Sequence, residues 1–211
     1  MKPRRIVIGG AVLALLVALG CWLLWPSAPP TLSLPDGQSL DVAQLEELTP
    51  LPEFSLERKG PPLTAADLRG RWSFVYFGYT NCPDACPATL GMLSHVQEGL
   101  QSQGLAPPRI VFVSLDPRRD TPELLHRYLA EFGPEAIGAT GSDAALRGLV
   151  TFFGVTFERK DQTDKTNYTI DHTTNFFLVT PDGRWLATFA PADDAESVLE
   201  DTLKLMRMPL P

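Results

Sequence analysis

The order of strand-like and helix-like segments constrains the fold of this chain more than any other feature of its sequence. Residues 72–79 form a run of aromatic and β-branched side chains that predicts a buried strand, and the residues after Pro87 show helical apolar spacing. A second apolar strand is expected over 109–115 and a second helix over 120–132. This alternation predicts a parallel β-α-β unit.

The second half of the chain predicts two further strands and two further helices. We expect a short helix over 142–152, strands over 176–179 and 185–189, and a final helix over 192–206. The Pro-Asp-Gly sequence between the two strands indicates a hairpin. Two parallel strands, an antiparallel hairpin and helices on both faces predict an α/β, thioredoxin-like fold with a central mixed sheet.

An apolar segment near the N-terminus, residues 6–25, contains no charged residue and predicts one transmembrane helix. The basic residues Lys2, Arg4 and Arg5 precede it, so the positive-inside rule places the N-terminus in the cytoplasm and the rest of the chain outside. We expect an uncleaved anchor, although a cleavable signal peptide is the alternative.

The sequence divides into three parts by composition. Residues 1–25 are the predicted membrane anchor, 26–44 a proline-rich tether, and 45–211 a single folded domain. The chain carries a formal net charge of −7, which argues against nucleic acid as a partner because such binding needs a basic surface.

Two of the three cysteines, Cys82 and Cys86, lie where the first strand meets the first helix. Cys86 is expected at the helix N-terminus, where free N–H groups favour a thiolate. The C-x-x-x-C spacing is wider than the redox motif C-x-x-C, and two thiolates select a soft ion, with Cu(I) favoured over zinc. A structural disulfide is the alternative interpretation of the same spacing.

The three histidines differ in their sequence surroundings. His95 and His126 lie on predicted helices among polar neighbours, which is typical of solvated surface residues. His172 follows Tyr-Thr-Ile-Asp just before a predicted strand, where a polar turn would present it toward the cysteines. From its local sequence alone, His172 is either a metal ligand or an ordinary loop histidine.

Three motifs occur in order along the chain. They are F-G-Y-T-N-C-P-D-A-C-P at 77–87, S-L-D-P-R-R-D-T-P at 114–122, and D-H-T-T with P-D-G downstream. Together they resemble the Sco/SenC family of copper chaperones. The resemblance runs from about Leu51 to the C-terminal helix.

The resemblance implies a thioredoxin-like domain, anchored by one helix, that binds copper through Cys82, Cys86 and His172. We expect one copper per chain, as Cu(I), Cu(II) or both. Asp84 is interpreted either as a group that tunes the thiolates or as a turn former. Asp116 and Arg119 are interpreted either as part of a partner-facing loop or as an Asp-Pro turn.

The function implied by the resemblance is assembly of the dinuclear copper site (CuA) of cytochrome c oxidase, by delivering copper or by reducing the cysteines of that site. The implied partners are the copper-bearing oxidase subunit, a copper donor protein and a thiol reductant. The expected location is the inner membrane, with the domain on the periplasmic side. The alternatives are a thiol-disulfide oxidoreductase, a thiol peroxidase, or a redox or copper sensor, with Cys82 and Cys86 as its redox thiols.

Overall fold

The computed structural model describes residues 43–160, 168–190 and 194–210. The predicted anchor at 1–25 and nearly all of the predicted tether lie outside these ranges. Within them, no helix is both long enough and apolar enough to cross a bilayer.

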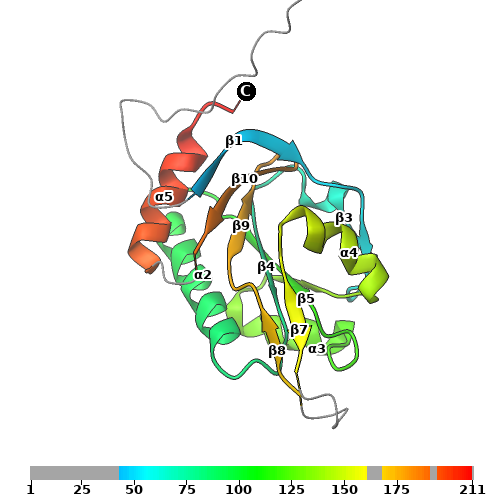
Figure 1. The fold of residues 1–211 in the computed structure, drawn as a ribbon. Coiled ribbons are helices and arrows are strands. Elements are labelled where there is room, and N and C mark those ends of the chain that lie inside the picture. Colours follow the sequence, from blue (N-terminus) through cyan, green and yellow to red (C-terminus); the bar gives the residue numbers. More distant parts are fainter. Residues whose placement is uncertain (1–42, 161–167, 191–193, 211) are drawn as a thin grey trace, which may run out of the picture. The chain divides into compact units, whose positions relative to one another are not determined.

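A six-stranded mixed sheet in the order β1-β10-β9-β4-β5-β6 forms the centre of the domain (Figure 1). Its strands are β1 (Ala43–Pro50), β4 (Ser73–Gly78), β5 (Arg109–Ser114), β6 (Ile137–Ala139), β9 (Phe176–Val179) and β10 (Arg184–Phe189). The neighbours β4, β5 and β6 pair in parallel, whereas β9 pairs antiparallel with both β4 and β10, and β1 pairs antiparallel with β10. The predicted thioredoxin-like α/β fold is confirmed.

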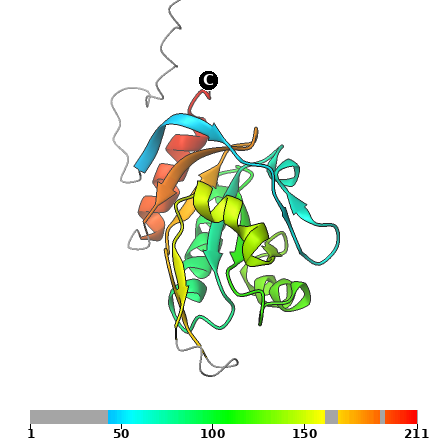
Figure 2. The same cartoon turned by 45° about the vertical axis from the view of Figure 1, so that its right-hand side comes forward.

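Helices cover both faces of this sheet (Figure 2). The helices are α2 (Ala85–Ser102), α3 (Pro122–Leu129), α4 (Asp143–Phe152) and α5 (Ala195–Arg207), with single 3-10 turns η2 (Ala65–Leu68) and η3 (Ala130–Phe132). Residues of α2, α3 and α5 pack into one hydrophobic cluster on one face. Residues of α4 pack into a second cluster on the other face, together with residues of η2 and of the short strands β2 (Ser55–Leu56) and β3 (Leu63–Thr64).

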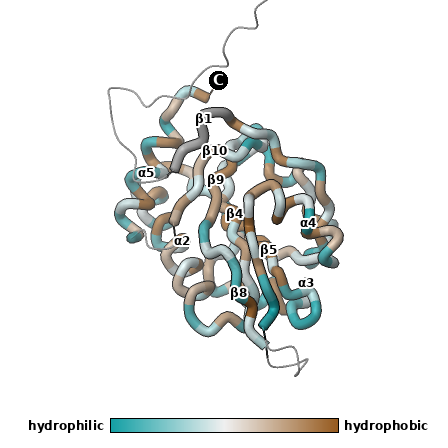
Figure 3. Tube along the Cα trace, viewed as in Figure 1, coloured by the Kyte–Doolittle hydropathy of each residue, from teal (hydrophilic) through white to brown (hydrophobic). Residues whose placement is uncertain are grey.

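Strand β4 shows why the central strands have continuous apolar runs. Phe74 and Tyr76 point to the α2 side, whereas Val75 and Phe77 point to the α4 side, and all four are at most 2% exposed. Because both faces of the strand are covered, these four positions are apolar or aromatic. Hydropathy colouring shows the same concentration of apolar residues along the central strands (Figure 3).

The predicted helix after Pro87 is confirmed as α2, whose buried face includes Leu90, Leu93, Val96 and Leu100. The second helix differs from the prediction at both ends. Its N-cap is Thr121, whose side chain accepts a hydrogen bond from the Leu124 N–H at 3.2 Å, and its last predicted turn is the 3-10 turn η3. 

The predicted helix over 142–152 and the hairpin of 176–189 are confirmed as α4 and β9–β10, and the final helix begins at Ala195.

Two small sheets, β2–β3 and β7–β8, were not predicted. Strands β7 (Phe157–Arg159) and β8 (Ile170–His172) pair antiparallel, Phe157 opposite His172. His172 thus ends a strand, and the prediction of a polar turn at this position was wrong. Strands of two or three residues are too short to show an alternating pattern.

Candidate metal centre

The sulfur atoms of Cys82 and Cys86 and a ring nitrogen of His172 all lie within 4.8 Å of one another. Cys82 lies in the turn after β4, Cys86 is the second residue of α2, and His172 is the last residue of β8. The junction of β4 and α2, which carries both cysteines, and the end of β8, which is far from it in the sequence, therefore meet at one end of the central sheet. The three residues expected to bind metal are brought together.

Cys86 is fully buried, and its surroundings determine the protonation of its sulfur. The Tyr76 hydroxyl donates to Cys86 Sγ at 3.7 Å, and the two residues belong to the same apolar cluster. Burial raises the pKa of Cys86 to about 12. The expectation that the helix N-terminus favours a thiolate here is not met in the metal-free protein, because burial disfavours the charged sulfur.

Cys82 is partly exposed, in contrast to Cys86. Its sulfur accepts a hydrogen bond from the Cys86 backbone N–H at 3.4 Å, and its own N–H donates to the Tyr79 carbonyl at 3.2 Å. Both cysteines are free thiols. The site therefore has one sulfur that solvent or a partner protein reaches and one that is shielded.

The imidazole of His172 is oriented with one nitrogen toward the thiols. Its Nδ1 lies 2.8 Å from the Thr173 carbonyl oxygen, which only accepts, so Nδ1 carries the proton. The lone pair of Nε2 then faces Cys86 Sγ at 3.6 Å. The ring makes edge contacts with Tyr76 and Tyr79, and burial lowers the His172 pKa, which favours the neutral form that ligates metals.

These atoms fit a soft metal ion. With metal–sulfur bonds of about 2.3 Å and metal–nitrogen bonds of about 2.0 Å, two ligands of a trigonal ion lie roughly 3.7 Å apart. The Cys86 Sγ to His172 Nε2 distance of 3.6 Å matches this value. Two thiolates and one neutral imidazole are a donor set suited to copper.

The other two histidines lie on exposed parts of helices. His95 is 74% exposed beside Glu98, and His126 is also exposed. The prediction that His95 and His126 are surface residues is confirmed.

Asp84 is exposed at the N-cap of α2 without a side-chain capping hydrogen bond, which is consistent with the turn-forming interpretation.

The interpretation of Asp116 and Arg119 as part of an Asp-Pro turn is confirmed, because the N–H groups of Arg119 and Asp120 donate to the Asp116 carbonyl at 3.1 and 2.9 Å. The alternative, a partner-facing loop, does not describe the side chain of Asp116. Its side chain is fully buried and accepts hydrogen bonds from the Tyr168 hydroxyl and the Arg119 guanidinium. Asp120, which the sequence suggested as the start of a helix, is buried as well. Sequence reasoning missed Tyr168 and Thr80, since a single Tyr or Thr in a loop carries no signal of a distant partner.

The fold and the site together define a thioredoxin-like protein with a two-cysteine, one-histidine centre for a soft metal. The SCO1/SenC family profile matches residues 43–207, and the chain belongs to this family. 

Individual relatives agree with this assignment. Protein SCO2 homolog, mitochondrial, of Bos taurus is 33% identical over 156 residues, which are 73% of this chain and 59% of the bovine protein. The chain thus spans less than two thirds of that relative's length. The crystal structure of Arabidopsis thaliana ScoI with copper bound has a TM-score of 0.70 at 30% identity, covering 74% of this chain and 97% of the other. Yeast Sco1 with copper bound has a TM-score of 0.70 at 28% identity, covering 77% and 91%.

Proposed function

We propose that this protein is a copper chaperone that holds one copper ion on Cys82, Cys86 and His172. The observation that carries the proposal is the convergence of two free thiols and one neutral imidazole within 4.8 Å. Copper-bound structures of Arabidopsis and yeast relatives with the same fold support the choice of metal. Copper is here the cargo, and the partly exposed Cys82 is the ligand from which it leaves.

We propose that the recipient is the CuA site of cytochrome c oxidase, as membership in the SCO1/SenC family supports. The protein delivers copper to the copper-bearing subunit or reduces the cysteines of that site before metal enters. Such a role requires two further partners, a protein that donates copper to this chain and a reductant that keeps its two cysteines as thiols. We place the domain on the periplasmic side of the inner membrane, held there by residues 1–25, on the strength of the apolar and basic pattern of the N-terminus.

The test of copper binding uses metal analysis with quantitative thiol titration. Reduced protein should bind one copper per chain, and His172→Ala should weaken the binding while a Cys82–Cys86 disulfide still forms. Protein oxidised to the disulfide should bind no Cu(I), because a disulfide offers no thiolate. Firm binding of two coppers, or undiminished uptake by oxidised protein, would contradict the proposed site.

A second function, thiol-disulfide exchange, is favoured by one specific observation. Cys82 is partly exposed and Cys86 is buried behind it, an arrangement of attacking and resolving thiols. In this reaction Cys82 attacks a disulfide of the target and forms a mixed disulfide. Cys86 then attacks the mixed disulfide and releases the target as two thiols, which leaves a Cys82–Cys86 disulfide. The thiol reductant then reduces this disulfide back to two thiols. If His172→Ala leaves copper affinity unchanged but slows this exchange, the oxidoreductase function is correct.

A further inference from the structure

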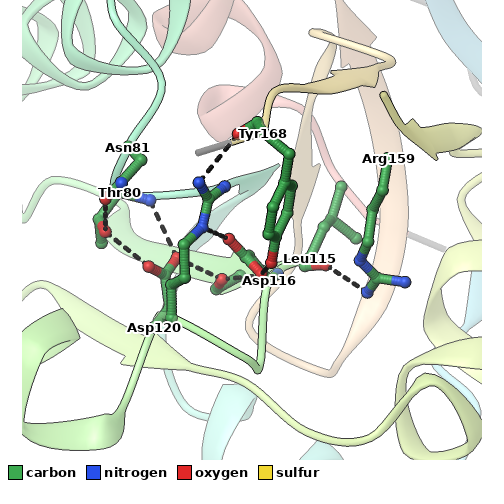
Figure 4. Close-up of polar contacts among 9 residues, drawn as sticks. Thr80, Asn81, Leu115, Asp116, Asp120, Arg159 and Tyr168 are labelled. Atoms are coloured by element: carbon green, nitrogen blue, oxygen red, sulfur yellow. Dashed lines mark hydrogen bonds and ion pairs between the residues drawn. The ribbon is translucent and has the colours of Figure 1, made fainter. Parts of the chain in front are cut away.

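We infer that the loop of residues 115–120, between β5 and α3, positions His172 relative to the two cysteines, with Arg119 and Asp116 as positioning residues. This inference rests on the proposed copper site. The loop contacts the cysteine turn on one side and the start of β8 on the other (Figure 4). None of its residues is a candidate ligand.

The contact with the cysteine turn is made by Asp120. Its carboxylate accepts hydrogen bonds from the Thr80 N–H at 2.9 Å and from the Thr80 hydroxyl at 2.5 Å. The Ser114 hydroxyl donates to the same carboxylate at 2.5 Å. Because Thr80 lies two residues before Cys82, these bonds fix the start of the turn that carries both thiols.

Asp116 and Arg119 make the contact with Tyr168, two residues before β8, and Figure 4 labels Asp116 and Tyr168. The buried Asp116 carboxylate accepts from the Tyr168 hydroxyl and pairs with the Arg119 guanidinium. Arg119 also donates to the Tyr168 carbonyl at 2.8 Å, and its guanidinium carbon lies 3.7 Å from the centroid of the Tyr168 ring. Tyr168 is thereby held at its hydroxyl, its ring and its backbone.

The strand pair that carries His172 needs this support. Strands β7 and β8 have three residues each and, among the residues that the structure describes, pair with each other alone, outside the six-stranded sheet. An isolated two-stranded sheet is marginally stable. Tyr168 anchors β8 four residues before His172, and Arg159 anchors β7 by donating to the Leu115 carbonyl of the same loop at 2.8 Å.

The loop therefore sets the distance between the thiols and the imidazole. Both of its carboxylates are fully buried, so each depends on the hydrogen bonds described above. Tyr168 also packs with Tyr79 and Ile170 in a small cluster against which Cys82 lies. A shift of the loop would move His172 without removing any of the three ligands.

The test is a double-mutant cycle in the full-length chain, with Tyr168→Phe and Arg119→Gln each made in the native and His172→Ala backgrounds. In the native background, Cu(I) affinity measured by competition should fall roughly 10–100-fold, as for other residues that orient metal ligands. In the His172→Ala background, the same substitutions should lower Cu(I) affinity by less than about twofold. The nitrogen hyperfine signal of the Cu(II) form should weaken, and the Cys82–Cys86 reduction potential should not change.

Tyr168→Phe removes one hydroxyl only, so it remains informative if Arg119→Gln fails to fold. Arg58→Gln is the matched control, because Arg58 resembles Arg119 in exposure and in pairing with an aspartate. The Arg58 side chain is 18% exposed and pairs with Asp67, and the Arg119 side chain is 13% exposed and pairs with Asp116. The control should leave copper affinity unchanged. Equal losses in both backgrounds would mean that the loop only supports the fold, and no loss with either variant would exclude the positioning role.

A metal-independent readout separates this inference from the proposed function. In the metal-free protein, the His172 ring lies against Tyr76 and Tyr79, so its C–H resonances should carry ring-current shifts. Tyr168→Phe should move these resonances toward the values of a free histidine. Absence of copper binding by the native protein would contradict the proposed function. Unchanged His172 resonances in Tyr168→Phe would contradict the positioning role, whether or not the protein binds copper.

Discussion

The buried sulfur of Cys86 depends on the absence of a side chain at Gly78. A Cβ at that position would lie 2.7 Å from Cys86 Sγ and 2.8 Å from a ring carbon of Phe112. Both distances are far below an ordinary contact, and both neighbours are fully buried. The end of β4 therefore has to be glycine for the sulfur to occupy its place beside His172.

Gly78→Ala should weaken Cu(I) affinity by roughly 10–100-fold, because the added methyl group displaces a ligand that must be held to within about 0.5 Å. It should also lower the free energy of unfolding by about 1–3 kcal/mol through overpacking. The matched control is Gly91→Ala on the exposed face of α2, where an added Cβ meets nothing within 4 Å. Competition titrations that give equal affinities for the two variants would contradict the argument.

The raised pKa of Cys86 predicts how copper binding depends on pH. A thiol with a pKa of about 12 is protonated at neutral pH, so Cu(I) must displace its proton. Apparent affinity should therefore rise with pH, by at least about tenfold per unit between roughly pH 7 and 9. His172 should not contribute to the pH dependence of affinity in this range, because its lowered pKa leaves the imidazole neutral. Anaerobic titrations with a competitor of known pH dependence measure the slope, and a flat profile would mean that Cys86 binds as a thiolate already formed.

At the scale of elements, α4 is joined to the sheet by an aromatic cluster. Phe153, the C-cap of α4, is 4% exposed and stacks on Phe177 of β9 with 4.5 Å between ring centroids. Edge contacts with Phe77 and Trp185 complete the cluster. This face of the sheet is opposite the one that packs against Cys86, so its packing affects stability more than the metal site.

Phe153→Ala should lower the free energy of unfolding by about 3–5 kcal/mol, since it leaves a cavity among rigid aromatic rings. Urea denaturation followed by Trp fluorescence measures the change. Copper stoichiometry of the folded protein should stay at that of the native chain. The control Thr151→Ala, at an exposed position of the same helix, should stay within about 0.5 kcal/mol. A loss of copper sites in folded Phe153→Ala protein would show that the two faces of the sheet are coupled.

At the scale of the whole molecule, copper binding should depend on the folded domain alone, whereas delivery of copper in the cell should depend also on the proposed anchor. A protein that begins after Trp25 should fold and bind copper in solution, because the family match begins at residue 43. An exported but unanchored form should nevertheless fail in the cell, since tethering raises the effective concentration of the site near a membrane target. The measurement is the copper content of cytochrome oxidase at matched protein abundance. Full restoration would mean that the N-terminal segment serves only for export.

The sequence by itself determined the main elements and the two cysteine ligands. The strands at 72–79 and 109–115 and the helix after Pro87 were predictable because hydrophobic periodicity and turn residues act locally. The same locality made Cys82 and Cys86 a predictable pair, since they lie four residues apart at one strand–helix junction. The fold class followed from the order of these elements.

The local sequence of His172 left its role open and only the family resemblance implied it, so the tertiary structure was needed to show how His172 and the buried loop behind it reach the site. His172 lies 86 residues from Cys86 in the sequence, and the short strand that carries it shows no periodicity. Asp116 forms the turn that its sequence predicted, but its side chain also accepts a hydrogen bond from Tyr168 of another segment, which was not predictable. The direction of the Cys86 pKa shift also depended on burial, which is a property of the packed chain. Contacts between distant segments leave no local pattern, so these features are visible only once the chain is folded.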